Sequence, residues 1–386
     1  MTKPASDLFP DHDGVTPRAA RGGIGHATGI LPAHAIRGLI RDQEIWGLKE
    51  IEENQVQPAS LDLRLGTTAY RLRASFLPGP KSSVMEKVEA FAFHKIDLTE
   101  GAVLETGCVY LVPLMEALAL SERTSASANP KSSTGRLDVF TRLITDHGAE
   151  FDQVEAGYKG HLYLEISPRT FSILVRAGSR LSQIRFRRGQ PTHTDTELRH
   201  LHEQERLVND EADIDGGLAL TVDLQGDADT GLVGYRGKRH SGLIDVDLRD
   251  GYDVLDFWEP IRANASGTMV LDPNEFYILA SREAVHVPAS HAAEMVPYNP
   301  LVGEFRVHYA GFFDPGFGSR AAGGAGSRAV LEVRSHDVPF ILEHGQVIGR
   351  LLYERLTDEP VELYGQGIGS SYQKQGLKLS KHFRTA

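Results

Sequence analysis

The chain has 386 residues, which is too long for one small domain and predicts two to three domains. Its residues are 41% hydrophobic and 24% charged, an ordinary globular composition that allows a sizeable core. The 41 basic and 52 acidic residues leave a formal net charge of −11. This charge argues against a protein that binds a nucleic-acid backbone, but it allows a small anionic ligand in a local pocket.

The single cysteine and the lack of long apolar runs indicate a soluble protein of a reducing compartment. Cys108 alone excludes an internal disulfide framework and a thiolate-cluster zinc site. No stretch reaches the roughly 18 apolar residues that a membrane span needs. Residues 1–30 have no continuous apolar segment and carry acids early, so we interpret them as a flexible arm and not as a secretory signal. We expect a cytoplasmic protein without a membrane partner.

In chain order, one short helix comes first and is followed mostly by short strands. Residues 32–48 place Ile36, Leu39 and Ile40 on one face, which predicts an amphipathic helix. The polar run at residues 195–210 predicts a helical linker. Five runs have the length and composition of strands and are bounded by Gly, Pro or Asp: residues 160–166, 170–178, 182–189, 275–281 and 338–345.

An internal repeat organises these elements. Residues 109–121 align with 276–288 (276 − 109 = 167), and residues 162–186 align with 329–353 (329 − 162 = 167). Glu165 then corresponds to Glu332, and the segment 61–66 resembles 246–251. We predict two homologous domains, residues 31–190 and 216–386, joined by a polar helical linker at 191–215.

The length of the repeat decides between two kinds of repeat protein. It is too long for a solenoid and fits domain duplication. Mainly β domains of this size with Gly and Pro turns close as sandwiches or barrels.

Five segments together resemble the dCTP deaminase branch of the dUTPase superfamily. In the first half they are "QPASLDLRLG" (residues 57–66), "PKSSTGRLDV" (130–139) and "GHLYLEI" (160–166). In the second half they are "AGFFDPGF" (310–317) and the tail "SSYQKQGLKLSKH" (370–382). The sequence departs from the family pattern at Lys131, where an arginine is usual.

The resemblance implies a fold and a reaction. It implies two distorted β-barrel or jelly-roll domains of the β-clip type, with a few short helices, in a homo-oligomer with active sites between subunits. The implied reaction is hydrolysis of dCTP to dUTP and ammonia in pyrimidine deoxynucleotide metabolism. It implies no zinc, Mg²⁺ bound with the triphosphate, and dTTP as a feedback inhibitor.

The chemistry of a zinc-free deaminase points to a carboxylate as general base and acid. The H-x-E…P-C-x-x-C pattern of zinc deaminases is absent. Glu165 is the candidate, because it lies on an apolar strand where burial would raise its pKa. Ser132 would hold the attacking water, together with a backbone carbonyl of residues 145–152, and Arg136 would orient the glutamate. Without the family pattern, a salt-bridged strand glutamate and capping serines explain the same residues.

Substrate-binding roles follow from the same resemblance. Ser133 and Lys131 would face the phosphates. The turn at Asp314 would hold the pyrimidine and deoxyribose and exclude a 2′-hydroxyl, although Asp-Pro-Gly is also a generic turn. Tyr372, Gln375 and Lys378 belong to a glycine-containing tail that would cover the triphosphate, the alternative being an ordinary disordered terminus. The histidines of residues 193–205 fit a solvated helix face, and we assign no metal site.

The repeat also predicts how the two halves share the work. At the offset of 167, three residues of the first-half loop have no chemical counterpart: Ser132 aligns with Asn299, Ser133 with Pro300 and Arg136 with Gly303. Conversely, the first half has Asp152-Gln153, with extra residues, where the second half has Asp314-Pro315. We therefore expect one composite site per chain, with catalysis from the first half and the tail from the second. Glu165→Gln should then abolish deamination, and Glu332→Gln should matter much less.

Other functions stay open at this point. The chain fits a dUTP pyrophosphatase or a bifunctional enzyme that makes dUMP, and it also fits a nucleotide-binding oligomer without turnover. The residues leave open the number of sites per chain, the oligomeric state, and whether the tail acts on its own chain or on a neighbour.

Overall fold

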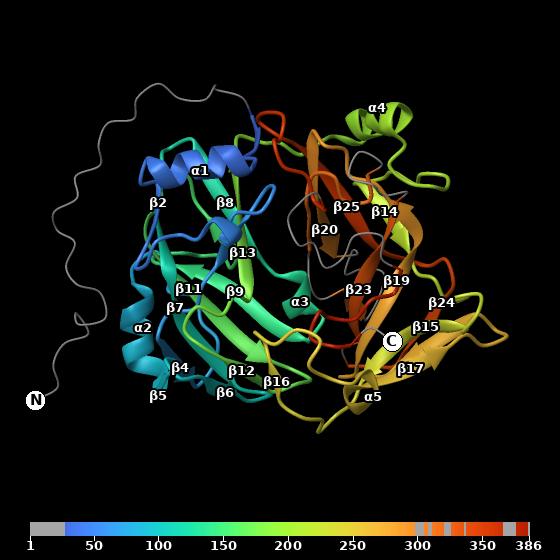
Figure 1. The fold of residues 1–386 in the computed structure, drawn as a ribbon, viewed down its shortest axis with the longest axis horizontal. Helices are drawn as coiled ribbons and strands as arrows, with labels where there is room; N and C mark the ends of the chain where they lie inside the picture. The colour runs from blue at the N-terminus through green and yellow to red at the C-terminus, as the bar shows by residue number, and fades with distance from the viewer. Residues whose placement is uncertain are drawn as a thin grey trace, which may run out of the picture.

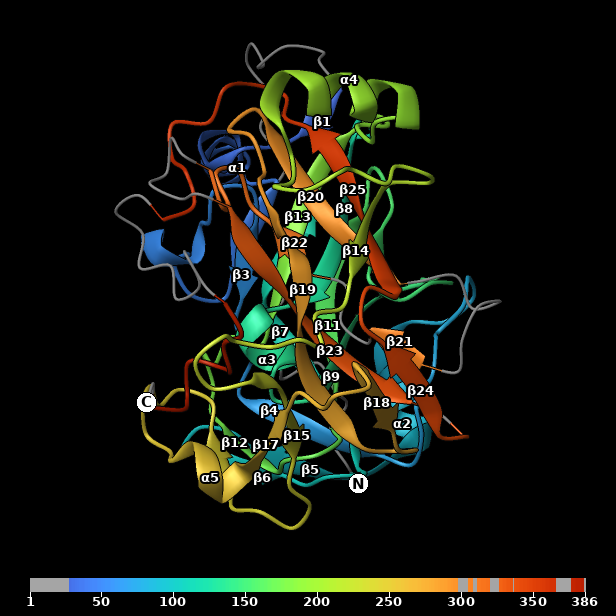
Figure 2. The ribbon, with the colours of Figure 1, turned by 90° about the vertical axis from the view of Figure 1, so that its right-hand side faces the viewer.

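The computed structural model describes residues 28–297, 305–307, 311–319, 326–335, 337–365 and 376–384. Two halves lie side by side, the first in blue to green and the second in yellow to red (Figure 1). Turned by 90°, the second half faces the viewer, with β19, β23 and β25 prominent (Figure 2). The described chain is mainly β, as the sequence predicts. The closure of each half into a barrel or jelly roll stays a prediction.

Three sheets involve the first half. The five-stranded sheet has the order β1-β13-β8-β10, with β3 also against β13: β1 Gly29–Ile30, β13 Ser182–Arg188, β8 Thr124–Pro130, β10 Gln153–Val154 and β3 Leu61–Leu63. The six-stranded sheet has the order β5-β4-β7-β11-β9, with β2 against β7: β5 Ala92–Asp97, β4 Thr68–Leu72, β7 Val109–Ala119, β11 Lys159–Pro168, β9 Val139–Thr145 and β2 Ile45–Gly47. The small sheet contains β16 Ile244–Asp245, β12 Ile173–Val175 and β6 Ala102–Leu104.

Three further sheets build the second half. The four-stranded sheet has the order β14-β25-β20-β22: β14 Leu218–Thr221, β25 Val347–Arg355, β20 His291–Pro297 and β22 Phe312–Phe313. The five-stranded sheet has the order β17-β15-β19-β23-β21: β17 Trp258–Arg262, β15 Leu232–Gly237, β19 Phe276–Val285, β23 Ser327–Ser335 and β21 Phe305–Val307. The two-stranded sheet pairs β18 Thr268–Leu271 with β24 Phe340–Glu343.

Strand register confirms the repeat. Glu165 of β11 lies opposite Leu111 of β7, and Glu332 of β23 lies opposite Ile278 of β19, each 167 residues later. The pairs of β13 with β8 and of β25 with β20 keep the same offset along their length. A slip of one residue would turn every side chain to the other face, so the shared register means that both halves present equivalent positions to equivalent faces.

One segment of the predicted repeat is wrong. Leu61 of β3 lies opposite Ile184, and Leu218 of β14 lies opposite Leu351, the position equivalent to Ile184. The counterpart of residues 61–66 is therefore the segment that begins at Leu218. Residues 246–251 instead follow β16, and the amide of Gly251 donates to the carbonyl of His382. The similarity of "LDLRLG" and "VDLRDG" is local and does not reflect equivalent places in the fold.

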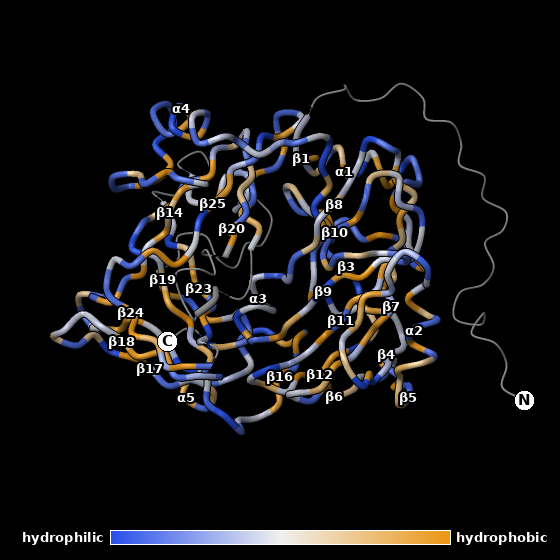
Figure 3. Tube along the Cα trace, turned by 180° about the vertical axis from the view of Figure 1, so that it is seen from behind, coloured by the Kyte–Doolittle hydropathy of each residue, from blue (hydrophilic) through white to orange (hydrophobic). Residues whose placement is uncertain are grey.

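The helices are short. α1 spans Ala33–Arg41 and buries Ile36 and Leu39, so the predicted apolar face is correct, but residues 45–47 form strand β2 where a continued helix was expected. α4 spans Asp195–Glu205 in the predicted linker, and its mostly hydrophilic residues appear blue in Figure 3. The other helices of the described residues are α2 Val84–Phe91, α3 Ser132–Gly135, α5 Val254–Phe257 and the 3-10 turn η2 Glu53–Gln55. Within the described chain no helix combines the length and apolarity that crossing a bilayer would require.

The two halves share a continuous hydrophobic core. Trp258 is fully buried at the start of β17 in the second half. Its ring packs edge-on against Phe171 of the first half, at 5.3 Å between centroids, and against Phe383 of the C-terminal segment, at 5.9 Å. Strand β16 of the second half also pairs in parallel with β12 of the first. The halves are therefore joined by core packing as well as by the linker.

This shared core predicts cooperative unfolding. Trp258→Ala removes a fully buried ring with contacts in both halves and should lower the free energy of unfolding by about 3–5 kcal/mol. We expect a single transition, moved as a whole to lower denaturant concentration, in far-UV circular dichroism. Phe93→Ala is the control, because Phe93 is 64% exposed and its loss should change stability by less than about 0.5 kcal/mol. Two transitions, only one of them shifted, would contradict the shared core.

Candidate active site

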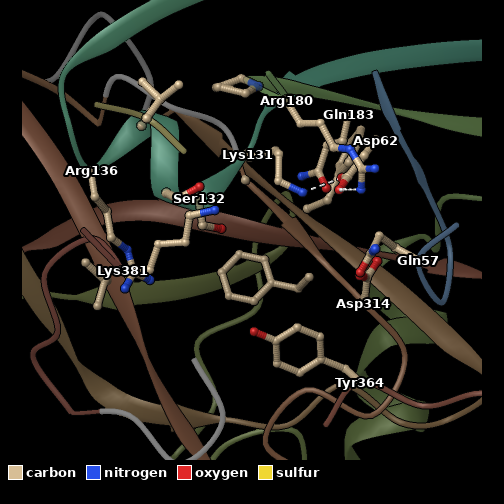
Figure 4. Close-up of a pocket in the computed structure, with 18 of the residues that line it drawn as sticks. Gln57, Asp62, Lys131, Ser132, Arg136, Arg180, Gln183, Asp314, Tyr364 and Lys381 are labelled. Carbon is tan, nitrogen blue, oxygen red and sulfur yellow. Dashed lines mark ion pairs between the residues drawn. The ribbon is translucent and has the colours of Figure 1, made fainter. Parts of the chain in front are cut away.

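A cavity of about 470 Å³ lies between the two halves (Figure 4). This volume is within the range of about 300–1,000 Å³ that small-molecule sites occupy. Its walls come from the loop after β8 in the first half, from β22, its turn and β23 in the second, and from the C-terminal segment. The cavity is therefore a composite of both repeats.

The loop after β8 forms one wall. The sequence suggests a polar loop, and the structure makes it a single helical turn, α3, in which the carbonyl of Lys131 accepts from the amides of Thr134 and Gly135. Ser132, Ser133 and Arg136 all line the cavity. The structure thus brings these three predicted residues together.

The C-terminal segment 376–384 supports this turn. The hydroxyl of Ser380 donates to the carbonyl of Ser133 at 2.7 Å, and Nη1 of Arg136 donates to the carbonyl of Lys378 at 3.0 Å. Leu379 and Phe383 belong to the shared core. The segment therefore fixes the backbone of α3 and the direction of the Arg136 side chain.

Glu332 of β23 completes the wall opposite α3. Its Oε1 lies 3.7 Å from Nε of Arg136, and both side chains are buried. Burial raises the pKa of Glu332 to about 7, against the lowering effect of the Arg136 charge. A carboxyl with this pKa exchanges protons near neutrality, which suits a general acid–base residue.

Glu165 lies elsewhere, and its expected grouping with Ser132 and Arg136 is not found. It is buried on β11 opposite Arg142 of β9, and its Oε1 accepts from Nε of Arg142 at 2.9 Å and from Nη2 at 2.6 Å. The guanidinium of Arg142 also stacks on Phe151 at 3.8 Å. Glu165 does not line the cavity, and neither do residues 145–152, which were expected to help hold the water. The reason is that the cavity forms between the halves, so the loop of one repeat meets the strand of the other.

The turn after β22 forms a second part of the wall. Asp314 lines the cavity, and the amide of Phe317 donates to the carbonyl of Asp314 at 3.1 Å. Gly316 has a φ of +91°, which glycine adopts without strain. Asp314 also accepts from Nη2 of Arg185 at 3.2 Å, and burial raises its pKa.

The first-half counterpart of this turn differs from the sequence alignment. Val154 lies opposite Ala126, and Phe313 lies opposite Ala293, which are equivalent positions of β8 and β20. The counterpart of Asp314 is therefore Glu155, one residue after Val154, and the alignment of Asp152 with Asp314 is wrong. This equivalence rests on the same strand pairing in both halves, whereas the similarity of the two sequences suggested Asp152 as the counterpart.

Basic side chains gather at another side of the cavity. Lys131 forms an ion pair with Asp62 of β3, and Nη1 of Arg180 lies 4.0 Å from the other oxygen of Asp62. Figure 4 shows these three side chains grouped with Gln183, apart from Ser132 and Arg136. Such a cluster is suited to phosphate oxygens, with arginine as a planar donor and lysine as a point charge.

The tail is described only in part. Tyr372 and Gln375 lie outside the described residues. Lys378 offers its backbone carbonyl to Arg136 and does not appear among the residues that line the cavity. Lys381 does line it, and burial lowers the pKa of Lys381 to about 8, with the nearby charge of Lys131 acting in the same direction.

Several wall residues were not predicted. They include Lys381, Tyr364, Asp62, Arg180, Gln57, Gln183, Asp247 and Arg249. A signal for one of them was present, because Asp62 lies in the quoted segment 57–66. In the described part of the chain no three His, Cys, Asp or Glu side chains group in a way that suits a metal ion.

Comparison with known proteins identifies the family of the chain. The N-terminal-domain model of the 2′-deoxycytidine 5′-triphosphate deaminase family matches residues 27–190, and the C-terminal-domain model matches residues 194–383. The chain belongs to the dCTP deaminase family. A crystal structure of 2′-deoxycytidine 5′-triphosphate deaminase from Agrobacterium tumefaciens is 62% identical, covers 86% of this chain and 99% of its own, and superposes with a TM-score of 0.83.

Curated relatives match a smaller part of the chain. The "dCTP deaminase, dUMP-forming" of Pseudarthrobacter chlorophenolicus is 30% identical over 41% of this chain and 78% of its own length. The "dCTP deaminase" of Halorubrum lacusprofundi is 30% identical over 35% of this chain and 64% of its own. Some of these relatives are thus named as forming dUMP, and others are named without a product.

The raised pKa of Glu332 predicts a pH-dependent stability. As pH rises from 4.5, its ordinary value, to about 7, the unfolded chain loses this proton while the folded chain keeps it, so the free energy of unfolding falls by roughly 3 kcal/mol. Glu332→Gln lacks this proton. Denaturant titrations should therefore show the variant gaining that amount relative to the native chain between about pH 4.5 and 8. A stability difference that stays constant with pH would contradict the raised pKa.

Proposed function

We propose that this dCTP deaminase family member hydrolyses dCTP to dUTP and ammonia at one composite site per chain, with Glu332 as the general base and acid. One observation carries this proposal. Ser132 and Arg136 of the first half line the same cavity as the buried Glu332 of the second half, and burial raises the pKa of Glu332 to about 7. Glu165 carried this role in the sequence-based hypothesis, but its ion pair with Arg142 lies away from the cavity.

The first step activates water. Ser132 lies on the cavity wall at the N-terminus of α3, and its hydroxyl would hold a water between itself and Glu332. The ionised carboxylate takes a proton from this water as the oxygen bonds to C4 of the cytosine. The carboxyl then passes the proton to N3, which gives a neutral tetrahedral intermediate.

The second step releases ammonia. The hydroxyl proton of the intermediate, which is the second proton of the water, moves to the carboxylate of Glu332 and from there to the 4-amino group, while the first proton stays on N3. The C4–N bond breaks, ammonia leaves, and the C4 carbonyl of dUTP forms. Arg136 stays charged throughout and offsets the negative charge of the carboxylate, and its hydrogen bond to the Lys378 carbonyl keeps its position constant between the two steps.

The rest of the nucleotide fits the two other parts of the wall. The triphosphate would lie against Lys131, Arg180 and Lys381, and Ser133 would donate to a phosphate oxygen. The turn at Asp314 would hold the pyrimidine and deoxyribose. Tyr372, Gln375 and the side chain of Lys378 would cover the triphosphate when it is bound.

Mg²⁺ fits this site as a companion of the triphosphate. It prefers oxygen ligands and keeps several waters or phosphate oxygens. The acidic wall residues near the basic cluster already have partners, since Asp62 pairs with Lys131 and Asp247 accepts from the Ser179 hydroxyl at 2.7 Å. Mg²⁺ would therefore be held mainly by the substrate and would neutralise phosphate charge.

The proposal extends to regulation and assembly. A pocket that holds a pyrimidine deoxynucleoside triphosphate also suits dTTP, so we propose dTTP as a feedback inhibitor. We also propose that the protein is a cytoplasmic homo-oligomer. Competition by dTTP in dCTP turnover, and the mass of the particle by light scattering, test these two points separately.

A second product is the alternative. Relatives named dUMP-forming favour a bifunctional reaction in which dUTP is also cleaved to dUMP and pyrophosphate. Incubation with dCTP and Mg²⁺, followed by quantification of ammonia, pyrophosphate and nucleotides, separates the possibilities. Ammonia with dUTP supports the proposal, ammonia with dUMP and pyrophosphate supports the bifunctional enzyme, and bound dCTP without ammonia indicates a binding protein.

The assignment of Glu332 predicts unequal effects of two matched substitutions. Glu332→Gln removes the proton carrier and should lower kcat for ammonia release by at least about 100-fold, the low end of what general acid–base catalysis contributes, with dCTP binding retained. Glu165→Gln is the control at the equivalent position of the other repeat and should lower kcat less than about threefold. The reverse order of effects would return the catalytic role to Glu165.

The pH profile gives an independent check. Glu332 must be ionised to accept the proton of water, so kcat/KM for dCTP should rise with pH through about 7 and level off above it. The rate of ammonia release from about pH 5.5 to 8.5 measures this. A profile that is flat over this range would argue against Glu332 as the base.

A further inference from the structure

A single buried arginine connects the first half to the substrate-facing turn of the second. Arg185 belongs to β13, and only 1% of it is exposed. Its side chain crosses the boundary between the halves and ends behind β22 and the following turn. It is not one of the residues that line the cavity.

The contacts of Arg185 hold the turn at several points. Nη1 donates to the carbonyl of Ala293 at 3.0 Å, and Nη2 donates to the carbonyl of Phe313 at 3.3 Å and to Oδ1 of Asp314 at 3.2 Å. The guanidinium stacks on the ring of Phe312 at 4.0 Å. A planar donor with this many fixed partners determines both the backbone path and the side-chain directions of the turn.

The other repeat shows that the fold does not require this arginine. The equivalent of Arg185, at the offset of 167, is Leu352 of β25. In the first half, the strand equivalent to β22 is held within its own half, because Nη2 of Arg187 donates to Oε1 of Gln153 at 2.9 Å. The interaction across the halves therefore occurs at the turn that faces the cavity and not at its counterpart.

We propose that Arg185 is a positioning residue that sets the shape of the turn at Phe312–Phe317 and thereby the affinity and sugar selectivity of the site. It acts through Phe313 and Asp314, which line the cavity, and not by touching substrate. The inference rests on the proposed function, in which this turn holds the pyrimidine and deoxyribose. Loss of Arg185 should loosen that contact while Ser132, Arg136 and Glu332 keep their positions.

The test compares Arg185→Leu, which copies the residue of the other repeat, with Arg64→Leu. Arg64 is a matched control: it is buried, pairs with the buried Glu116 at 2.7 Å, and donates to two backbone carbonyls, but neither it nor Glu116 lines the cavity. Calorimetry measures the Kd for dCTP, and ammonia release measures kcat/KM for dCTP and for CTP. Thermal unfolding checks that each variant is folded.

We expect Arg185→Leu to raise the Kd for dCTP at least tenfold and to reduce the preference for dCTP over CTP at least tenfold, with kcat for dCTP changed less than threefold. Arg64→Leu should lower the midpoint of thermal unfolding without changing the Kd for dCTP or the preference for dCTP over CTP. Arg185→Lys keeps the charge but not the planar guanidinium, so its Kd for dCTP and its preference for dCTP should lie between those of the native chain and of Arg185→Leu. If Arg185→Leu does not fold, Arg185→Lys provides the test.

Two results would overturn the inference. One is a folded Arg185 variant with native Kd and native selectivity, and the other is an equal change caused by Arg64→Leu. A native chain that binds dCTP without releasing ammonia would instead reject the proposed function, and the Kd values would still test the role of Arg185.

Discussion

The buried contact between Glu332 and Arg136 is the interaction on which the site depends. It joins a strand of the second repeat to a helical turn of the first, and both side chains are shielded from water. A buried carboxylate is costly unless it is paired, and at 3.7 Å the pairing with Arg136 is incomplete. The result is a carboxyl that holds its proton up to about pH 7. The same burial that weakens the folded chain at high pH therefore gives the group a pKa suited to proton transfer.

Other charges that cross the boundary keep this contact in place. Arg334 lies two residues from Glu332 on β23, so both side chains point to the same face, and it forms an ion pair with Asp138 in the first half. Asp138 follows Arg136 by two residues. The two arginine–carboxylate contacts thus connect the same two segments with opposite polarity. Since exchanging their partners would place like charges together, they fix the register of one half against the other.

The two repeats have diverged around the same framework. Glu165 and Glu332 occupy equivalent positions with equivalent strand partners, yet Glu165 is neutralised by Arg142 of its own half and Glu332 faces Arg136 of the other. A carboxylate with two short hydrogen bonds from one guanidinium is part of the sheet structure. A carboxylate with a more distant charge remains available for chemistry. In the proposed mechanism, duplication thus leaves one copy with a structural role while the other serves the site.

The sequence alone predicted much of the fold. Short runs rich in β-branched and aromatic residues predicted the strands, because local propensity and alternation depend on neighbours in the chain. The repeat at 167 residues predicted the duplication, and strand register confirmed it. The prediction that helix 32–48 continues past Arg41 failed because pairing with β7 outweighs helix propensity at Ile45–Gly47.

The sequence also identified half of the candidate site. Ser132, Ser133, Arg136 and Lys131 stand in one short segment, and residues that are close in the chain stay close in the fold. It grouped Glu165 with them, whereas Glu332, the equivalent residue of the other repeat, is the glutamate that lines the cavity. The tertiary structure decided that point, because the packing of one repeat against the other is set by side chains such as Trp258 and Arg334, which are far from the loop in sequence. Local pattern determined what each repeat is, and the contacts between repeats determined which residues share a cavity.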